Sequence, residues 1–168
     1  CSQLGVSTDP DADKKMEYSP TLVRNLPYNV IQVACGGIHS VALTEFGDVY
    51  TWGCNDDFAL GRGDVAEEYL VTKITEGFGR DQGQIVAIDA GDSHTLFLSM
   101  DGNVYSCGMY KDMDSGKFKD VPPGSTKCKG VNEIPFPVAM PQPVRAIASG
   151  FTWNAAILAD DSLVTWGK

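Results

Sequence analysis

The stretch that decides the fold runs from Ile85 to Gly108 and reads I-V-A-I-D-A-G-D-S-H-T-L-F-L-S-M-D-G-N-V-Y-S-C-G. Residues 30–53 and 144–167 align with it without a gap. The three copies begin 55 and 59 residues apart. Self-similarity at about this period is typical of repeat architectures, in which each unit is one small supersecondary module. Columns that the copies share therefore indicate structure, and columns in which they differ are the place to look for function.

Each copy alternates short apolar runs with turn residues. One shared column holds Gly36, Gly91 and Gly150, where a residue without Cβ can turn or let another backbone approach. A second break, at 46–47, 101–102 and 160–161, separates two apolar runs, and in the second copy it is a D-G pair, which favours a hairpin. No stretch sustains a helical period over the length that a helix needs. The copies therefore predict an all-β module with three strands each.

A fourth strand is available upstream of each copy. The candidates are Thr21–Val23, Tyr69–Ile74 and Phe136–Ala139, and the proline beside the first and within the last is typical of a sheet edge. Four strands per unit at this period predict the four-stranded antiparallel blade of a β-propeller. A β-sandwich is the rival architecture, but it would not require the same glycines in three copies.

Several motifs resemble one family. The stretches G-G-I-H-S, G-D-V-Y-T-W-G-C-N-D-D-F-A-L-G-R-G and A-G-D-S-H-T, together with the opening C-S-Q-L-G, resemble the regulator of chromosome condensation family. The resemblance implies a seven-bladed propeller, of which residues 1–168 would form one partial domain of about three blades. Its repeat cores would be 30–53, 85–108 and 144–167, with a long loop at 109–134. Because the chain begins and ends within a motif, we expect it to be a fragment of a longer protein.

The resemblance also implies a function. The A-G-D-S-H-T and N-D-D-F-A-L-G-R stretches are similar to those of a chromatin-associated guanine-nucleotide exchange factor for a Ran-type small GTPase. Such a protein regulates a GTPase and is not a bond-making or bond-breaking enzyme, so no cofactor and no metal are expected. The implied location is nuclear, with chromatin and histones contacted through parts outside this fragment. The alternative is a propeller interaction module without exchange activity, as in relatives fused to ubiquitin ligases.

Asp92 is the first candidate site residue. Its column holds Gly37 and Phe151 in the other copies, so the fold does not demand a carboxylate there. It lies in a predicted turn between strands, where functional side chains concentrate on a rigid scaffold. The resemblance implies that Asp92 faces the GTPase. The alternative is an Asx-turn in which the carboxylate caps its own loop.

The connection at 109–134 is the second candidate region. Between residues 111 and 129 it carries five lysines and three aspartates in an otherwise acidic chain, and long loops in a compact fold are often functional. Its start resembles the protruding wedge with which the family's exchange factor presses on the phosphate-binding loop of the GTPase. The residues carried over as GTPase-binding are Lys111, Asp112, Met113, Asp114 and Gly116.

Thr152 is the third candidate. The family's exchange factor has S-G-N-D-H where this chain has S-G-F-T-W, so Thr152 replaces an aspartate that the resemblance makes central to exchange. A threonine cannot bring a charge to that position. The substitution favours the alternative of a module without exchange activity.

Two further columns contain residues that often carry chemistry. His39 and His94 share one column with Trp153, and a slot that recurs between repeats favours a structural imidazole over a catalytic or metal-binding one. Trp52 and Trp166 share another with Cys107, which favours packing over a ligand cage. Asp56 and Asp57 lack a further carboxylate at ligand spacing and are interpreted as a solvated turn.

Composition excludes several classes of protein. A formal net charge of −9 disfavours direct nucleic-acid binding, because affinity for phosphates comes from clustered Lys and Arg; it fits a basic protein partner or simple solubility. Five cysteines without C-x-x-C spacing indicate neither a disulfide framework nor a zinc site, and they fit a reducing compartment. No apolar run approaches membrane-spanning length, and no membrane contact is expected.

Overall fold

The computed structural model describes residues 2–6, 16–66, 69–78, 83–109 and 131–167. The regular secondary structure in these ranges consists of β-strands alone, as predicted. The described residues therefore contain no helix that is long and apolar enough to cross a membrane.

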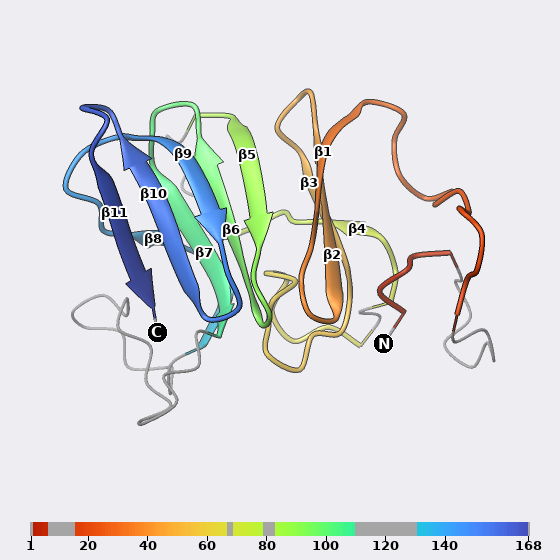
Figure 1. The fold of residues 1–168 in the computed structure, drawn as a ribbon. Coiled ribbons are helices and arrows are strands. Elements are labelled where there is room, and N and C mark those ends of the chain that lie inside the picture. The colour runs from red at the N-terminus through yellow and green to blue at the C-terminus, as the bar shows by residue number, and fades with distance from the viewer. Residues whose placement is uncertain (1, 7–15, 67–68, 79–82, 110–130, 168) are drawn as a thin grey trace.

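The strands form three antiparallel sheets in chain order (Figure 1). Blade 1 contains β1 (Val30–Cys35), β2 (His39–Thr44), β3 (Val49–Gly53) and β4 (Thr72–Lys73). Blade 2 contains β5 (Ile85–Ala90), β6 (His94–Ser99), β7 (Val104–Met109) and β8 (Val131–Val138). Blade 3 contains β9 (Val144–Ser149), β10 (Trp153–Leu158) and β11 (Leu163–Gly167). Four-stranded antiparallel sheets standing side by side are the blades of a propeller.

The fourth strand belongs to a different repeat from the one predicted. β4 pairs with β3, and β8 pairs with β7, so each of these strands completes the preceding blade and does not open the next one. Thr21–Val23 forms no strand. The physical reason is that the third strand of each core leaves an open edge, which the chain covers before it crosses to the next blade. β8 contains Pro135 and Pro137 and lies at the outer edge, where a missing donor is tolerated.

Tight hairpins join the second and third strands of every blade. The turn residue has a positive φ in all three: 81° at Gly47, 79° at Gly102 and 68° at Asp161. Glycine adopts this conformation without a steric cost, and aspartate is among the few other residues that tolerate it. The break that the three copies share therefore reflects a left-handed backbone conformation that few residue types can adopt.

Each pair of neighbouring blades encloses its own apolar core. Between blades 1 and 2, Leu43 and Val41 of β2 pack with Phe97 and Ile88, and the ring of Phe78 lies edge-on to Phe97 at a centroid distance of 5.1 Å. Between blades 2 and 3 the core contains Leu96, Leu98, Val104, Val138, Val144, Ala156 and Leu158. Strands β2 and β6 are buried at every position. Strand β6 lies in blade 2, between blades 1 and 3, and β2 lies between blade 2 and the N-terminal segment, where Gln3 accepts a hydrogen bond from Ser40.

Blades 1 and 3 each leave one face uncovered. Val33 in β1 is 65% exposed, whereas Ile88, in the same column of β5, is 1% exposed because blade 1 covers it. On the other side, Trp153 in β10 is 50% exposed, whereas His39 and His94 in the same column are 1% and 0% exposed. These faces have the apolar composition of the inter-blade contacts.

Candidate functional site

The loops that join the first and second strands of each blade lie edge to edge at one end of the molecule. The backbone N–H of Gly37 donates to the carbonyl of Asp92 at 3.1 Å, and the N–H of Asp92 donates to the carbonyl of Phe151 at 3.1 Å. We call the residues of these three loops, 36–38, 91–93 and 150–152, the loop rim. Asp92 is its central residue and is fixed on both sides by neighbouring blades.

The Asp92 side chain is half-buried against blade 1. Its Oδ2 accepts a hydrogen bond from Ser93 Oγ at 3.3 Å. Its Oδ1 lies against Gly37, so closely that a Cβ on Gly37 would overlap it. An Asx-turn would require a hydrogen bond from a backbone N–H of the same loop to this carboxylate. No such bond is present among the described residues. Gly37 and Asp92 occupy the same position in aligned repeats. Gly37 of blade 1 leaves the space that the Asp92 carboxylate of blade 2 occupies.

Thr152 lies on the same rim, in the loop of blade 3. It is half-buried, and it directly follows Phe151, whose carbonyl accepts the hydrogen bond from the Asp92 N–H. The Phe151 side chain is 68% exposed beside it. The backbones of Asp92 and Thr152 therefore lie in neighbouring loops.

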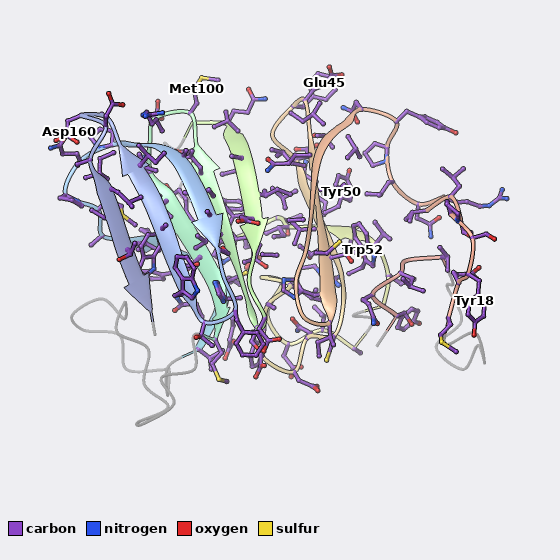
Figure 2. All side chains as sticks on the ribbon, in the orientation of Figure 1. Tyr18, Glu45, Tyr50, Trp52, Met100 and Asp160 are labelled. Atoms are coloured by element: carbon purple, nitrogen blue, oxygen red, sulfur yellow. The ribbon has the colours of Figure 1, made fainter. Side chains whose placement is uncertain are left out.

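The remaining candidates, Lys111, Asp112, Met113, Asp114 and Gly116, lie outside the described residues. The described residues that flank this segment are next to the loop rim. The Met109 N–H donates to the Ser93 carbonyl at 2.8 Å, and Met109 pairs with Val131 across β7 and β8. Ser93, to which Met109 is hydrogen-bonded, directly follows Asp92 in the loop rim. The β2–β3 and β6–β7 hairpin turns, marked by Glu45 and Met100 in Figure 2, lie at the opposite end.

The two histidines join one blade to the next. His39 Nε2 is 2.9 Å from Thr95 Oγ1 in blade 2, and His94 Nε2 is 2.8 Å from Asn154 Oδ1 in blade 3. Burial lowers the pKa of His39 from 6.5 to about 4, and burial also lowers the pKa of His94. Both rings are therefore neutral at physiological pH. These bonds between blades give both histidines a structural role. Among the described residues, no group of three or more His, Cys, Asp and Glu side chains could hold a metal ion.

The tryptophan and cysteine column packs inside the blades. Trp52 Nε1 donates to the Gln3 carbonyl at 2.9 Å, and Cys107 Sγ donates to the Ala59 carbonyl at 3.3 Å. Burial raises the pKa of the Cys107 thiol, which keeps it protonated and unreactive. In blades 1 and 2 this column therefore holds a connecting loop against the blade, which agrees with a packing role.

Two residues that the sequence analysis did not single out bridge the first strands of the blades. Gln32 in β1 accepts from the Ile88 N–H at 3.0 Å and donates to the Ile88 carbonyl at 2.8 Å. Asp89 in β5 accepts from the Ser149 N–H at 2.6 Å. The available signal was a polar side chain in a column where the other copies have alanine. Both residues fix the spacing of the loops on the rim.

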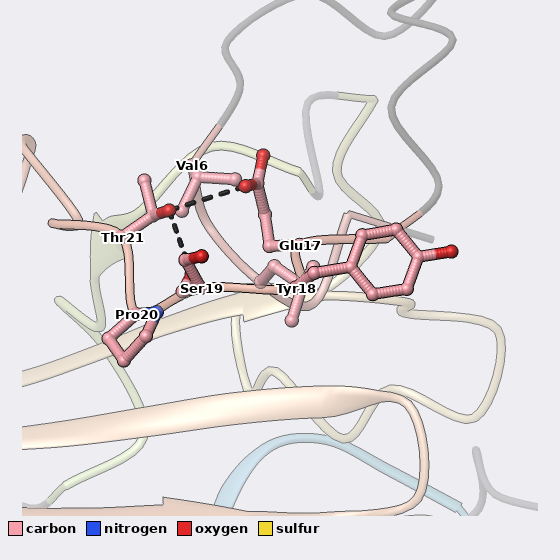
Figure 3. A pocket seen from close by; sticks show the side chains of 7 residues that line it. Val6, Glu17, Tyr18, Ser19, Pro20 and Thr21 are labelled. Carbon is pink, nitrogen blue, oxygen red and sulfur yellow. Dashed lines mark hydrogen bonds between the residues drawn. The ribbon is translucent and has the colours of Figure 1, made fainter.

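A shallow pocket lies in the N-terminal segment (Figure 3). It is lined by Leu4, Val6 and residues 17–21, and Tyr18 in its wall is 87% exposed. Thr21 Oγ1 donates to the Ser19 carbonyl at 3.1 Å within it. Among the described residues, no buried polar side chain lines this pocket, and we assign it no site.

Comparison with known proteins identifies the repeats. The model of the Regulator of chromosome condensation (RCC1) repeat matches residues 2–43 and 47–98, and a second model of the same description matches residues 30–58 and 85–115. The human protein named Regulator of chromosome condensation is 34% identical over 98% of this chain. The chain belongs to the RCC1 repeat family. It spans 36% of the length of that relative and of the Xenopus laevis protein of the same name, which is 36% identical. Human E3 ubiquitin-protein ligase HERC2 is 34% identical over 83% of the chain, which spans 3% of it.

Solved structures agree with the propeller. Human WBSCR16 aligns with a TM-score of 0.68 and 25% identity over 82% of this chain and 33% of its own. Yeast RCC1 (Prp20), in a structure with Kap60, aligns with a TM-score of 0.66 and 26% identity over 83% and 32%. A second structure of Prp20p, described with its binding to Gsp1p and histones, gives 0.64 and 28% over 83% and 33%. The chain is therefore an RCC1-type partial propeller.

Proposed function

We propose that the chain is part of a guanine-nucleotide exchange factor for a Ran-type GTPase and that the loop rim binds the GTPase. The observation that carries the proposal is the place of Asp92. Its backbone is hydrogen-bonded to the loops of both neighbouring blades, and Met109, the last described residue before 110–130, is hydrogen-bonded to Ser93 beside it. A preorganised carboxylate next to a long, lysine-bearing segment suits recognition of a GTPase surface that has both phosphate-binding and basic elements.

The proposed action needs no covalent chemistry. An exchange factor binds the nucleotide-free GTPase more tightly than the loaded form, and linkage then weakens nucleotide binding by the same factor. Asp92 would supply a fixed negative charge that attracts a basic residue of the GTPase or opposes the nucleotide phosphates. Lys111, Asp112, Met113, Asp114 and Gly116 would press on the phosphate-binding loop. Thr152, which is neutral, would make this rim a weaker partner than one with an aspartate there.

The same resemblance suggests a cellular location and further partners. We propose a nuclear protein that contacts chromatin and histones through parts outside this chain. The relative Prp20p is described as binding Gsp1p and histones, which supports a GTPase and a histone partner here. The net charge of −9 is compatible with basic protein partners.

The direct test is release of a fluorescent guanine nucleotide from a Ran-type GTPase by the full-length protein. The proposal predicts accelerated release. It also predicts that Thr152→Asp accelerates release further, because the substitution adds a charge next to Asp92, and that deletion of residues 111–118 slows it. A protein that leaves the release rate at its intrinsic value, in both the wild-type and the Thr152→Asp form, would contradict exchange activity.

The second candidate is a propeller interaction module without exchange activity. Two observations favour it: Thr152 stands in place of the expected aspartate, and the chain is 34% identical to a segment of HERC2, a ubiquitin ligase. This alternative predicts that the full-length protein binds a protein partner through the loop rim while nucleotide release stays unchanged. Binding and release, measured on the same samples, separate the two candidates.

A further inference from the structure

Two large apolar side chains are exposed on the loop rim. Phe151 in the loop of blade 3 is 68% exposed, and Ile38 in the loop of blade 1 is 45% exposed. The turn that contains Phe151 is closed by the Gly150 N–H, which donates to the Trp153 carbonyl at 2.7 Å. The Phe151 carbonyl accepts the hydrogen bond from the Asp92 N–H. An exposed aromatic residue is therefore held on a closed turn directly beside a residue with a carboxylate.

A third apolar residue, Phe58, lies in the loop at 54–58 that follows β3. A Cβ on Gly108 would come 3.1 Å from the Ala59 Cα and would overlap the Ser93 carbonyl, so Ala59 and Ser93 both lie next to Gly108. Phe58 directly precedes Ala59, and its backbone therefore lies beside the rim loop of blade 2. In Figure 1 the loop lies at the lower end of the blades, where the rim loops turn.

The backbone of Phe58 is in a conformation that suits glycine. Its φ is 58°, in the left-handed region, where a bulky side chain is costly. The side chain is half-buried, and among the described residues the two apolar cores between the blades do not include it. Packing of the blades therefore does not explain an aromatic residue at this position. Backbone strain of this kind is typical of functional sites.

The charge of the surface around these residues is negative. The rim loops and residues 54–58 together contain three carboxylates, those of Asp56, Asp57 and Asp92, and these described residues include neither lysine nor arginine. A cationic side chain with a long apolar stem complements such a surface. Its charge pairs with a carboxylate, its stem packs against apolar side chains, and the face of an aromatic ring attracts the cation directly.

We propose that Phe151 and Phe58 are apolar anchors of the loop rim and that, together with Asp92, they bind one lysine or arginine side chain of the GTPase. The inference rests on the proposed GTPase site and names the chemistry that this site recognises. Apolar contacts do not depend on charge. The anchors therefore account for binding by a rim in which the neutral Thr152 stands in place of an aspartate.

The affinity of the full-length protein for a nucleotide-free Ran-type GTPase tests the proposal. Phe151→Ala should weaken binding by about tenfold, because it truncates an aromatic side chain that the partner buries. This loss should persist at high salt, since the contact with the ring stem is apolar. The matched control is Phe46→Ala. Phe46 is 69% exposed in the β2–β3 turn, at the opposite end of the blades, and its variant should bind like the wild-type protein.

Two further variants test the shared side chain and the strained backbone. In Asp92→Ala/Phe151→Ala the combined loss of affinity should be smaller than the product of the two single losses, because both residues contact the same cationic side chain. Phe58→Gly should weaken binding and yet unfold at the same urea concentration as the wild-type protein or a higher one, because glycine relieves the left-handed backbone. A phenylalanine that only packs would give a lower midpoint.

Three results would overturn the proposal: equal affinities of Phe151→Ala and Phe46→Ala, independent losses in the double variant, or a lower urea midpoint for Phe58→Gly. Binding without nucleotide release would reject exchange activity and leave the anchors standing. Accelerated release together with wild-type affinity of Phe151→Ala would retain the proposed function and reject the anchors. A wild-type protein that does not bind the GTPase would reject both.

Discussion

At the scale of single residues, the glycine and the histidine of each G-x-x-H turn work as a pair. A Cβ on Gly91 would overlap the imidazole of His94 and would also lie 2.6 Å from the carbonyl of Gly150 in the next blade. The ring occupies this space in order to reach Asn154 across the blade boundary. The sequence predicted that this glycine column serves a turn or a close approach, and close approach is the reason, since no positive φ occurs there.

Gly91→Val should therefore destabilise the fold. The side chain has to displace both a buried ring and a backbone carbonyl, and we expect a loss of roughly 1–3 kcal/mol in the free energy of unfolding. The control is Gly63→Ala, where a Cβ meets nothing within 4 Å and only the φ of 71° opposes it. Urea unfolding of both variants measures the difference. Equal losses would show that close packing at Gly91 is unimportant.

His39 predicts a pH dependence of stability. Its pKa is lowered from 6.5 to about 4 in the folded protein, so the unfolded chain binds the proton first as the pH falls. Its contribution to stability is complete above pH 6.5, is lost as the pH falls from 6.5 to about 4, and changes no further below that. The full loss is on the order of 3 kcal/mol. His39→Gln, which retains a nitrogen near Thr95 but does not titrate, should flatten this part of the curve of unfolding free energy against pH. Parallel curves for the two proteins would contradict the assignment.

At the scale of elements, the sequence predicted the strands of each repeat core well and the fourth strand poorly. The three-strand cores are predictable because turn glycines and alternating apolar residues recur in three copies. The pairing of β4 and β8 is not predictable from local pattern, because it depends on which neighbouring edge is open. β4 has only two residues, Thr72 and Lys73, and carries almost no periodic signal.

The bridges between first strands give a prediction at this scale. Gln32→Ala removes two hydrogen bonds to Ile88 and should lower the free energy of unfolding by about 1–3 kcal/mol. Asp89→Ala removes the bond from the Ser149 N–H and should act similarly. The matched control is Gln142→Ala, because Gln142 makes one exposed hydrogen bond to Asp160. Chemical denaturation in which all three variants lose the same small amount would show that the bridges do not hold the blades together.

At the scale of the whole molecule, the candidate site was predictable only in part. Asp92 could be singled out as a candidate because its column differs between copies, and the structure shows that Gly37 leaves room for its carboxylate. The neighbouring place of Thr152 was expected from its position in the equivalent loop of the next repeat, and the hydrogen bond from the Asp92 N–H to the Phe151 carbonyl provides the contact between the two loops.

The loop rim and the hairpin turns lie at opposite ends of the blades, which provides a matched pair of charge changes. Asp92→Ala removes one carboxylate from the rim. Glu45→Ala removes one carboxylate at the hairpin end, where Figure 2 labels Glu45. Because exposed charges are screened beyond a Debye length of about 8–10 Å, an effect of Asp92 on a GTPase should be larger at low salt.

The central claim is that the rim around Asp92 is the GTPase site, and the rate of nucleotide release from a Ran-type GTPase tests it most directly. With the full-length protein, we predict that Asp92→Ala slows release by roughly fivefold or more, which corresponds to the lower end of typical coupling free energies. The effect should shrink as salt is added, and Glu45→Ala should release nucleotide at the wild-type rate. Equal rates for Asp92→Ala, Glu45→Ala and the wild-type protein, at low and high salt, would contradict the account.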